Sequence, residues 1–322
     1  MSVTEAEATT RSRMPDNRQA ARGRPGRRRT RIPLWMLVPC FVALALIVII
    51  PVVMTIVLSF HGIDASALRN IAAAPFVGLE NFFVAFDSQN ALGVGALQSL
   101  GLSVGFSMLT TLLTLPIGFI AALTVHEAFR GRAAIRAIYL IPYVLPMFVT
   151  AILARIAFMD QNGLVDRTLG LFGFDTSSHL LLGANAFWSM VATDVWAQWP
   201  FVYLFTLAGL QGIPRELFEA AELDGAGKFQ KIRLIVLPSV KHMLTLAVLL
   251  STLHHFGNFT LAYVMFSAPP PASVMVLPIS TFFYAFTTFD YGVASALAVL
   301  AMIVLLVPAY VYIRASRLAE ND

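Results

Sequence analysis

Residues 219–238 read EAAELDGAGKFQKIRLIVLP, a charged stretch set between long apolar runs. Pro214, just upstream, suits the first turn of a helix, and Glu216 lies where a helix N-terminus favours an anion. Gly225 is a natural helix end. The pattern therefore predicts a helix of about three turns, a glycine break and a second helix after Gly227.

The first predicted helix has the character of a docking element. Its apolar residues are interrupted by Ala220 and Ala221, which allow close approach of a partner's backbone, and a helix of this length can fill a groove. Glu219 and nearby acidic residues offer charges to a basic rim. An ordinary loop of mixed charge is the alternative. The second helix reads as amphipathic and typical of the inner leaflet, and we expect Pro238 to end it.

Composition indicates a membrane protein. The chain has 322 residues, of which 58% are hydrophobic and 12% are charged, whereas a soluble domain carries about 25% charged residues. Cys40 is the single cysteine, which excludes an internal disulfide and a cysteine metal cluster. We find no catalytic constellation and predict no metal site. No G-x-x-x-x-G-K-[ST] loop is present to hold a nucleotide phosphate.

Apolar stretches of about 20 residues are long enough to cross a bilayer as helices. The chain has six candidates, at about 34–60, 97–125, 135–158, 188–211, 241–266 and 291–313. With both termini inside the cell, 19 of the 22 Lys and Arg residues fall on inner segments. The positive-inside rule therefore predicts an N-in, C-in orientation and places Glu219 in the cytoplasm.

The N-terminal segment 1–33 differs from the rest of the chain. It holds nine arginines and no aromatic residue, so it lacks the apolar surface that would form a core, and we predict a disordered cytoplasmic tail. Nucleic-acid binding is one alternative for the arginine run. A cleaved signal peptide is another, although the apolar run that follows is longer than the roughly 7–15 residues of a signal core.

The charged stretch, with Glu219-Ala220-Ala221, Asp224-Gly225-Ala226 and a later Leu-Pro, resembles the EAA motif of permease subunits of binding-protein-dependent ABC importers. Four further stretches resemble the same family, and the resemblance is nearest to its carbohydrate-uptake branch. They are FVGLENF (76–82), LIPYVLP (140–146), AGLQGIP (208–214) and DYGVASA (290–296).

The resemblance implies an all-α membrane protein with six transmembrane helices, in the type I ABC importer architecture with a cytoplasmic coupling helix. It implies a permease domain over 34–315, with its coupling segment at 212–239, and a short cytoplasmic tail at 316–322. The motif positions that would couple the chain to an ATPase are Glu216, Glu219, Ala220, Ala221, Asp224, Gly225, Ala226, Phe229 and Pro238.

The resemblance also implies partners. They are a second six-helix permease, two ABC ATPase subunits (different or identical) that bind ATP and Mg²⁺, and an extracytoplasmic solute-binding protein. This chain would bind no cofactor and catalyse no reaction itself. The cargo would be a sugar or oligosaccharide, and glycerol phosphate or another small polar solute is the alternative.

Polar residues inside the predicted spans are candidates for the solute pathway, since an ionised side chain facing lipid costs about 2.5–3.5 kcal/mol and sugars are held by polar groups and aromatic faces. An interhelical hydrogen bond that only stabilises the bundle is the alternative for each. The candidates are Asp194, Gln198, Trp199, His254 and Asn258.

Two other classes of membrane protein are alternatives to an ABC importer permease. A secondary transporter is expected to show membrane-embedded coupling carboxylates or inverted repeats, and only Asp194 offers itself. A membrane enzyme requires a catalytic constellation that the sequence lacks.

Overall fold

The computed structural model describes residues 34–67, 70, 74–89, 92–160, 163–173, 179–266 and 268–319. Secondary structure in these ranges is helical, apart from one isolated bridge between His61 and Phe76. The predicted all-α class is therefore confirmed. The arginine-rich tail and Arg69 lie outside the described residues.

The chain divides into two units, one up to Ile50 and one from Pro51 onward. In the first, a 3₁₀ turn (Leu34–Leu37) leads into α1 (Val38–Leu44) and a π-helical turn (Ala45–Ile49). The helix continues as α2 (Ile50–Leu58). The run Val38–Leu58 has a mean hydropathy of 3.1 and is long and apolar enough to cross a membrane.

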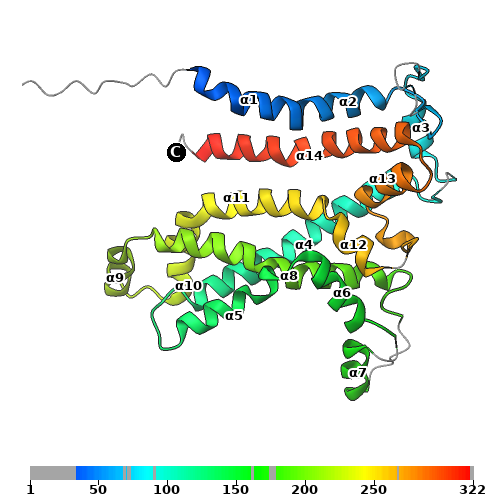
Figure 1. The fold of residues 1–322 in the computed structure, drawn as a ribbon. Helices are drawn as coiled ribbons and strands as arrows, with labels where there is room; N and C mark the ends of the chain where they lie inside the picture. Colours follow the sequence, from blue (N-terminus) through cyan, green and yellow to red (C-terminus); the bar gives the residue numbers. More distant parts are fainter. Residues whose placement is uncertain are drawn as a thin grey trace, which may run out of the picture. The chain divides into compact units, whose positions relative to one another are not determined.

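Three long helices pack together at the centre of the second unit: α4 (Ala96–Thr124), α8 (Asn185–Gln211) and α11 (Leu237–Phe256) (Figure 1). Small residues allow the contact between α4 and α8. A Cβ atom at Gly118 would lie 2.7 Å from the backbone nitrogen of Tyr203, so only glycine fits there. Close approach through small residues is a usual way for membrane helices to associate.

Among the described residues, four helices are long and apolar enough to span a membrane, and a fifth span results if α5 (Arg132–Val144) and α6 (Met147–Ala157) count as one. The axes of α5 and α6 differ by 88°, so the predicted span 135–158 is broken. Proline at position 146 cannot continue the α5 hydrogen-bond ladder. The predicted span 188–211 lies within helix α8, which is long enough to cross a bilayer but is less apolar than these helices because it carries polar residues such as Asp194 and Gln198.

The region around the predicted fifth span differs from expectation at both ends. The predicted end of the amphipathic helix at Pro238 is wrong, since Lys228–Phe256 is one helical run. It comprises α10 (Lys228–Lys231), a π-helical turn (Ile232–Val236) and α11. Pro238 lies in the first turn of α11, where a proline is tolerated. At the other end, α11 stops at Gly257 and a separate α12 (Phe259–Met265) follows, so 241–266 is not one helix.

The last third of the chain holds an element that the sequence did not indicate. Within the predicted outer segment 267–290, a 3₁₀ turn (Ala272–Val274) is followed by α13 (Leu277–Phe286), which packs against α14 (Tyr291–Ala319) and α4. This helix is too short to span a bilayer, so length alone gave no reason to expect it.

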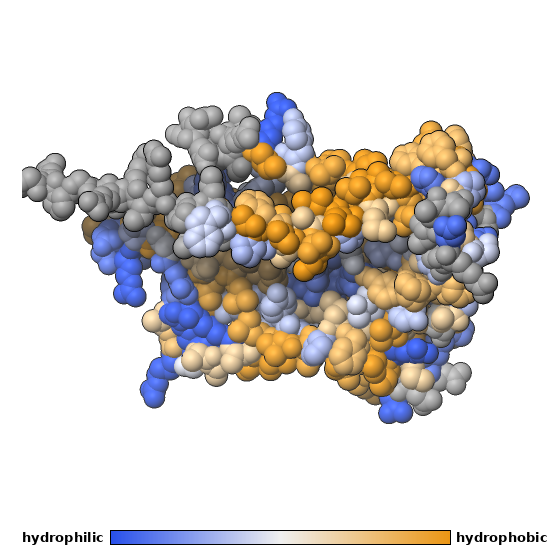
Figure 2. Space-filling model, turned by 45° about the horizontal axis from the view of Figure 1, so that its top comes forward, coloured by the Kyte–Doolittle hydropathy of each residue, from blue (hydrophilic) through white to orange (hydrophobic). Residues whose placement is uncertain are grey.

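Two short helices complete the described fold. They are α3 (Glu80–Phe86), which begins within the FVGLENF stretch, and α7 (Leu164–Leu171). On the face drawn in Figure 2, apolar residues cover much of the surface and hydrophilic residues gather toward the ends. That distribution suits helices surrounded by lipid along their middle.

Candidate functional site

The helix predicted from the charged stretch is present as α9 (Arg215–Leu223), which begins after Pro214. It ends in a Schellman motif. The backbone N–H of Ala226 donates to the carbonyl of Ala221 at 2.8 Å, and that of Gly225 donates to the carbonyl of Glu222 at 3.0 Å. Gly225 has φ +77°, a conformation that favours glycine. The predicted stop at Gly225 is confirmed.

Two contacts hold α9 to its neighbours. Lys231 Nζ lies 2.6 Å from Glu222 Oε1, which joins α10 to α9. Phe218 packs against the cluster formed by α4, α8 and the start of α11, and its ring centroid is 5.8 Å from that of His126, which follows α4. The helix is therefore fixed at its base on the ends of the long helices.

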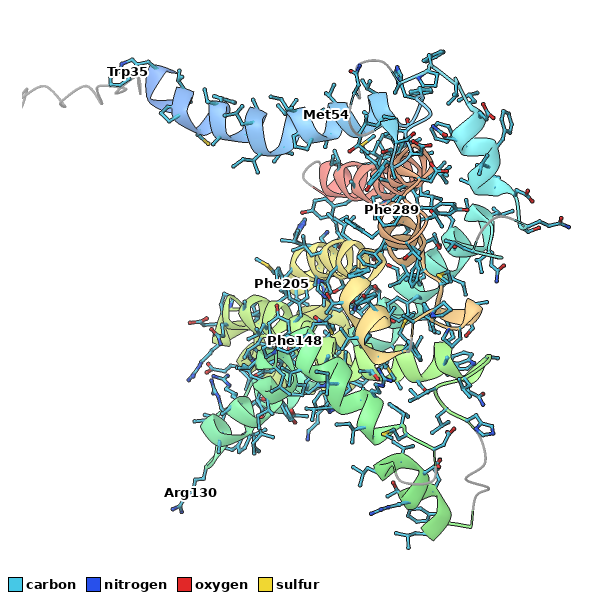
Figure 3. All side chains as sticks on the ribbon, turned by 45° about the vertical axis from the view of Figure 1, so that its right-hand side comes forward. Trp35, Met54, Arg130, Phe148, Phe205 and Phe289 are labelled. Carbon is cyan, nitrogen blue, oxygen red and sulfur yellow. The ribbon has the colours of Figure 1, made fainter. Side chains whose placement is uncertain are left out.

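His126 is placed to act as an uncharged packing group. Burial lowers the pKa of the His126 imidazole, opposed by Glu127 and reinforced by the positive charges of Arg132, Arg136 and Arg215. The neutral ring thus packs on Phe218 at neutral pH. Arg136 also donates from Nη2 to the carbonyl of Val125 at 3.0 Å. In Figure 3, Arg130 projects away from the helices at this turn.

The side of α9 away from this base is exposed. Leu223 is 90% exposed and Phe229, at the start of the next helix, is 74% exposed. Glu219 and Ala220 are exposed beside them. Apolar side chains at such exposure on a charged segment suit an interaction surface, and we call Leu217, Glu219, Ala220, Leu223 and Phe229 the docking face because contact with a partner is predicted there.

The other predicted coupling residues lie close to this face. Glu216, Asp224 and Gly225 are exposed, whereas Ala221 and Ala226 are half-buried. Pro238 is exposed in α11, beyond the turn that joins α9 to α10. Contact of any of these residues with an ATPase stays a prediction.

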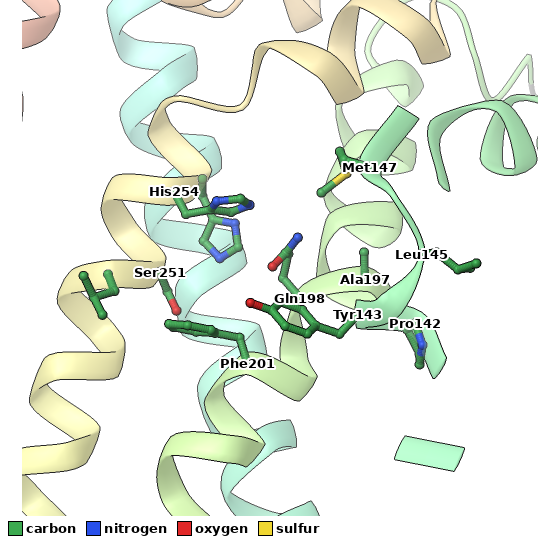
Figure 4. Close-up of a pocket in the computed structure, with 11 residues that line it drawn as sticks. Pro142, Tyr143, Leu145, Met147, Ala197, Gln198, Phe201, Ser251 and His254 are labelled. Carbon is green, nitrogen blue, oxygen red and sulfur yellow. The ribbon is translucent and has the colours of Figure 1, made fainter. Parts of the chain in front are cut away.

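A pocket of about 550 Å³ lies where the break between α5 and α6 faces α8 and α11 (Figure 4). Tyr143 comes from the end of α5, Gln198 and Phe201 from α8, and Ser251 and His254 from α11. None of the lining residues is Asp, Glu, Lys or Arg. Aromatic faces with a few convergent polar groups are typical of a small-molecule site.

Beside the pocket, polar side chains of α8, of α11 and of the residue that precedes α12 meet in a buried cluster. Asn258 Nδ2 donates to Asp194 Oδ1 at 2.9 Å, and His255 Nδ1 lies 2.6 Å from Asp194 Oδ2. All three residues are buried. Asn258 Oδ1 accepts from the backbone N–H of Leu261 at 3.2 Å and so caps α12. This cluster, called the Asp194 cluster below, joins α8 to both sides of the break at Gly257.

The predicted pathway residues therefore fall into three groups. Gln198 and His254 line the pocket. Asp194 and Asn258 pair with each other outside the lining. Trp199 packs among aromatic residues, with its ring centroid 5.3 Å from that of Tyr139. A role for these residues in solute passage stays a prediction.

The sequence interpretation did not single out Tyr143, Phe201 and Ser251, nor the pairing of His255 with Asp194. The helical spacing of Ser251, His254 and His255, which puts them on one side of a helix, was the available signal. The aromatic residues carried none, because aromatic residues are abundant throughout the chain.

Comparison with known proteins identifies the family of the chain. Residues 114–317 match the family model of the binding-protein-dependent transport system inner membrane component. A trehalose/maltose transport system permease protein of Thermococcus litoralis is 30% identical over 91% of this chain and 96% of its own length. A sulfoquinovosyl glycerol transport system permease protein of Agrobacterium fabrum is 29% identical, covering 88% of this chain and 89% of the relative.

A solved structure shares the fold. A chain of a bacterial ABC transporter involved in the import of the acidic polysaccharide alginate superimposes with a TM-score of 0.72 at 20% identity, covering 87% of this chain and 94% of that one. The family match covers well over half of the chain. The chain therefore belongs to the inner membrane permease components of binding-protein-dependent ABC transporters.

Proposed function

We propose that this chain is one of two permease subunits of an ATP-driven importer that takes up a neutral carbohydrate. The named relatives support a sugar: one is a trehalose/maltose permease and another, in Streptococcus pneumoniae, is a maltodextrin permease. The absence of Lys and Arg among the described residues of the pocket lining supports a neutral cargo, since an anionic solute such as glycerol phosphate calls for cationic partners. A binding protein would deliver the solute to the outer segments.

The proposed topology has six spans with both termini in the cytoplasm. The four apolar helices and the α5–α6 pair supply five, and α8 is the sixth. Helix α8 has seven more residues than the roughly 20 that a helix needs to cross a bilayer core. Four of its polar residues, Ser189, Thr193, Asp194 and Thr206, are buried and Gln198 lines the pocket, so these residues need not face lipid. In this orientation α9 lies inside the cell.

The proposed division of the chain follows from that topology. An arginine-rich tail (1–33) precedes a permease domain (34–315), whose coupling segment is 212–239, and a short tail (316–322) follows. Helix α14 runs on to Ala319, so the boundary near 315 marks where the helix would leave the membrane, not where it ends.

The proposed coupling mechanism rests on the exposure of the docking face, where Leu223 and Phe229 are accessible to a partner. Two ATPase subunits, which bind ATP and Mg²⁺, would each grip the docking face of one permease. ATP-driven closure of the ATPases would then move α9. Because Phe218 and the Lys231–Glu222 pair fix α9 to the ends of α4 and α11, that movement would reach the pocket helices and switch the pathway between inward- and outward-facing states. This chain would catalyse no reaction.

Charge reversal at the docking face tests the proposal. Glu219→Lys should reduce both the co-purification of the ATPase subunits and ATP-dependent sugar uptake in proteoliposomes. Glu80→Lys, an exposed reversal on α3, is the matched control and should leave both unchanged. Uptake by the chain without any ATPase, or full assembly and uptake in Glu219→Lys, would contradict the proposal.

A further inference from the structure

The carboxylate of Asp194 is buried next to His255, a residue that lines the pocket. Asp194 has no solvent exposure and does not line the pocket. One of its oxygens accepts from Asn258, and the other lies 2.6 Å from His255 Nδ1 in a short contact that is not aligned as an ideal hydrogen bond. A carboxylate oxygen repels a nitrogen lone pair at this distance, so the contact is favourable only when Nδ1 carries the ring proton.

His255 is the member of this cluster that reaches the pocket. The residue is 2% exposed and forms part of the pocket lining. Its ring lies edge-on to Phe106 and to His254, with centroid distances of 6.5 Å and 5.8 Å. Its second nitrogen, Nε2, is buried and has no hydrogen-bond partner among the described residues. A buried nitrogen in this state is destabilising until a partner reaches it.

We infer that Asp194 is a positioning residue for the solute: it holds the ring of His255, a residue of the pocket lining, so that Nε2 pairs with a hydroxyl of a sugar bound in the pocket. A hydroxyl both donates and accepts, so it suits Nε2 in either protonation state of the ring. Carboxylates that orient a ligating histidine through its other nitrogen act in the same way at metal sites. Asp194 itself touches no solute. This inference rests on the proposed function and adds a residue to it.

Direct solute binding tests the inference without the binding protein, whose own affinity would dominate uptake. The purified permease–ATPase complex is titrated with tritiated glucose, trehalose, maltose and maltotriose in a scintillation proximity assay. Asp194→Asn should raise Kd for the bound sugar about threefold to tenfold, the range of one hydrogen bond, while binding capacity per complex stays constant. His255→Phe should raise Kd by a similar factor.

The double variant makes the test specific. If Asp194 acts through His255, Asp194→Asn should change Kd no further in the His255→Phe background. Equal factors in both backgrounds would overturn the inference, as would a loss of binding capacity with unchanged Kd, which indicates a structural role only. His255→Gln, with a polar side chain, is the second variant if His255→Phe assembles poorly. Failure of the intact complex to bind any of the four sugars would overturn the carbohydrate assignment and this inference together.

Discussion

Gly292 and the side chain of Asn81 lie so close that a Cβ atom at position 292 would fall 2.7 Å from Asn81 Nδ2. It would also fall 2.6 Å from the carbonyl oxygen of His61. Asn81 Nδ2 in turn donates to the carbonyls of Ser59 and His61, both at 2.9 Å. The motifs at 76–82 and 290–296 thus meet at one point, where α3 and the start of α14 pack on the segment after α2.

Gly292→Ala should destabilise the permease. The added methyl group has to displace backbone or the buried amide, and overpacking of this kind costs about 1–3 kcal/mol. The measurement is the thermal unfolding midpoint of the detergent-purified complex. Gly101→Ala is the control, because nothing lies within 4 Å of a Cβ atom there, and it should leave the midpoint unchanged or raise it. Equal effects of the two variants would refute the role given to Gly292.

Gly225→Val should weaken the coupling segment for a conformational reason. Open space surrounds the residue, so sterics do not exclude a side chain, but its positive φ disfavours a β-branched residue. We expect a loss of ATPase co-purification in Gly225→Val and much less in Gly225→Asn, since asparagine tolerates this conformation. A similar loss in both variants would point to direct contact of the glycine with the partner instead.

Substitutions at Asn258 and Gln198 should distinguish a residue that stabilises the bundle from one that contacts the solute. Asn258→Leu removes the hydrogen-bond partner of one oxygen of the buried Asp194 carboxylate, and leaving that oxygen unpaired costs about 1–3 kcal/mol. We expect the amount of assembled complex and sugar uptake to fall together. Gln198→Leu alters the pocket and should lower uptake per assembled complex. Quantitative immunoblotting measures the assembled complex, and transport assays measure uptake. If Asn258→Leu lowered uptake per complex and Gln198→Leu lowered assembly, the structural role would belong to Gln198 and the pathway role to Asn258.

Features that depend on neighbouring residues could be predicted from the sequence, whereas features that depend on contacts between distant segments could not. The end of α9 at Gly225 depends on neighbouring residues alone, so its residue types were sufficient. The pairing of Asp194 with His255 joins two helices that are far apart in sequence, and no local pattern encodes it. The bend between α5 and α6 was allowed by Pro142 and Pro146, but its angle depends on what packs against each half. Helix α13 was missed because its short sequence resembles a loop by length.

His126 should make the attachment of α9 sensitive to pH. Burial lowers the pKa of this imidazole, so the folded state binds the proton less readily than the unfolded state does. Its contribution to stability is therefore complete above about 6.5, the ordinary pKa of histidine, and is lost as pH falls from that value through the lowered pKa of the folded state. Hydrogen exchange in α9 should accelerate as the pH is lowered from neutral into the acidic range, after correction for intrinsic rates. His126→Phe should abolish the acceleration, and an unchanged pH response in that variant would exclude His126 as the cause.

The most direct test of the account asks what Leu223 touches. This side chain is 90% exposed on the docking face, and a photoreactive amino acid in its place should cross-link to an ATPase subunit in the assembled complex. The same substitution at Phe289, which is exposed in the proposed outer segment, should give no ATPase adduct. We predict an ATPase adduct from position 223 and none from position 289. A Leu223 adduct with the solute-binding protein, or labelling of position 223 from outside intact cells, would contradict it.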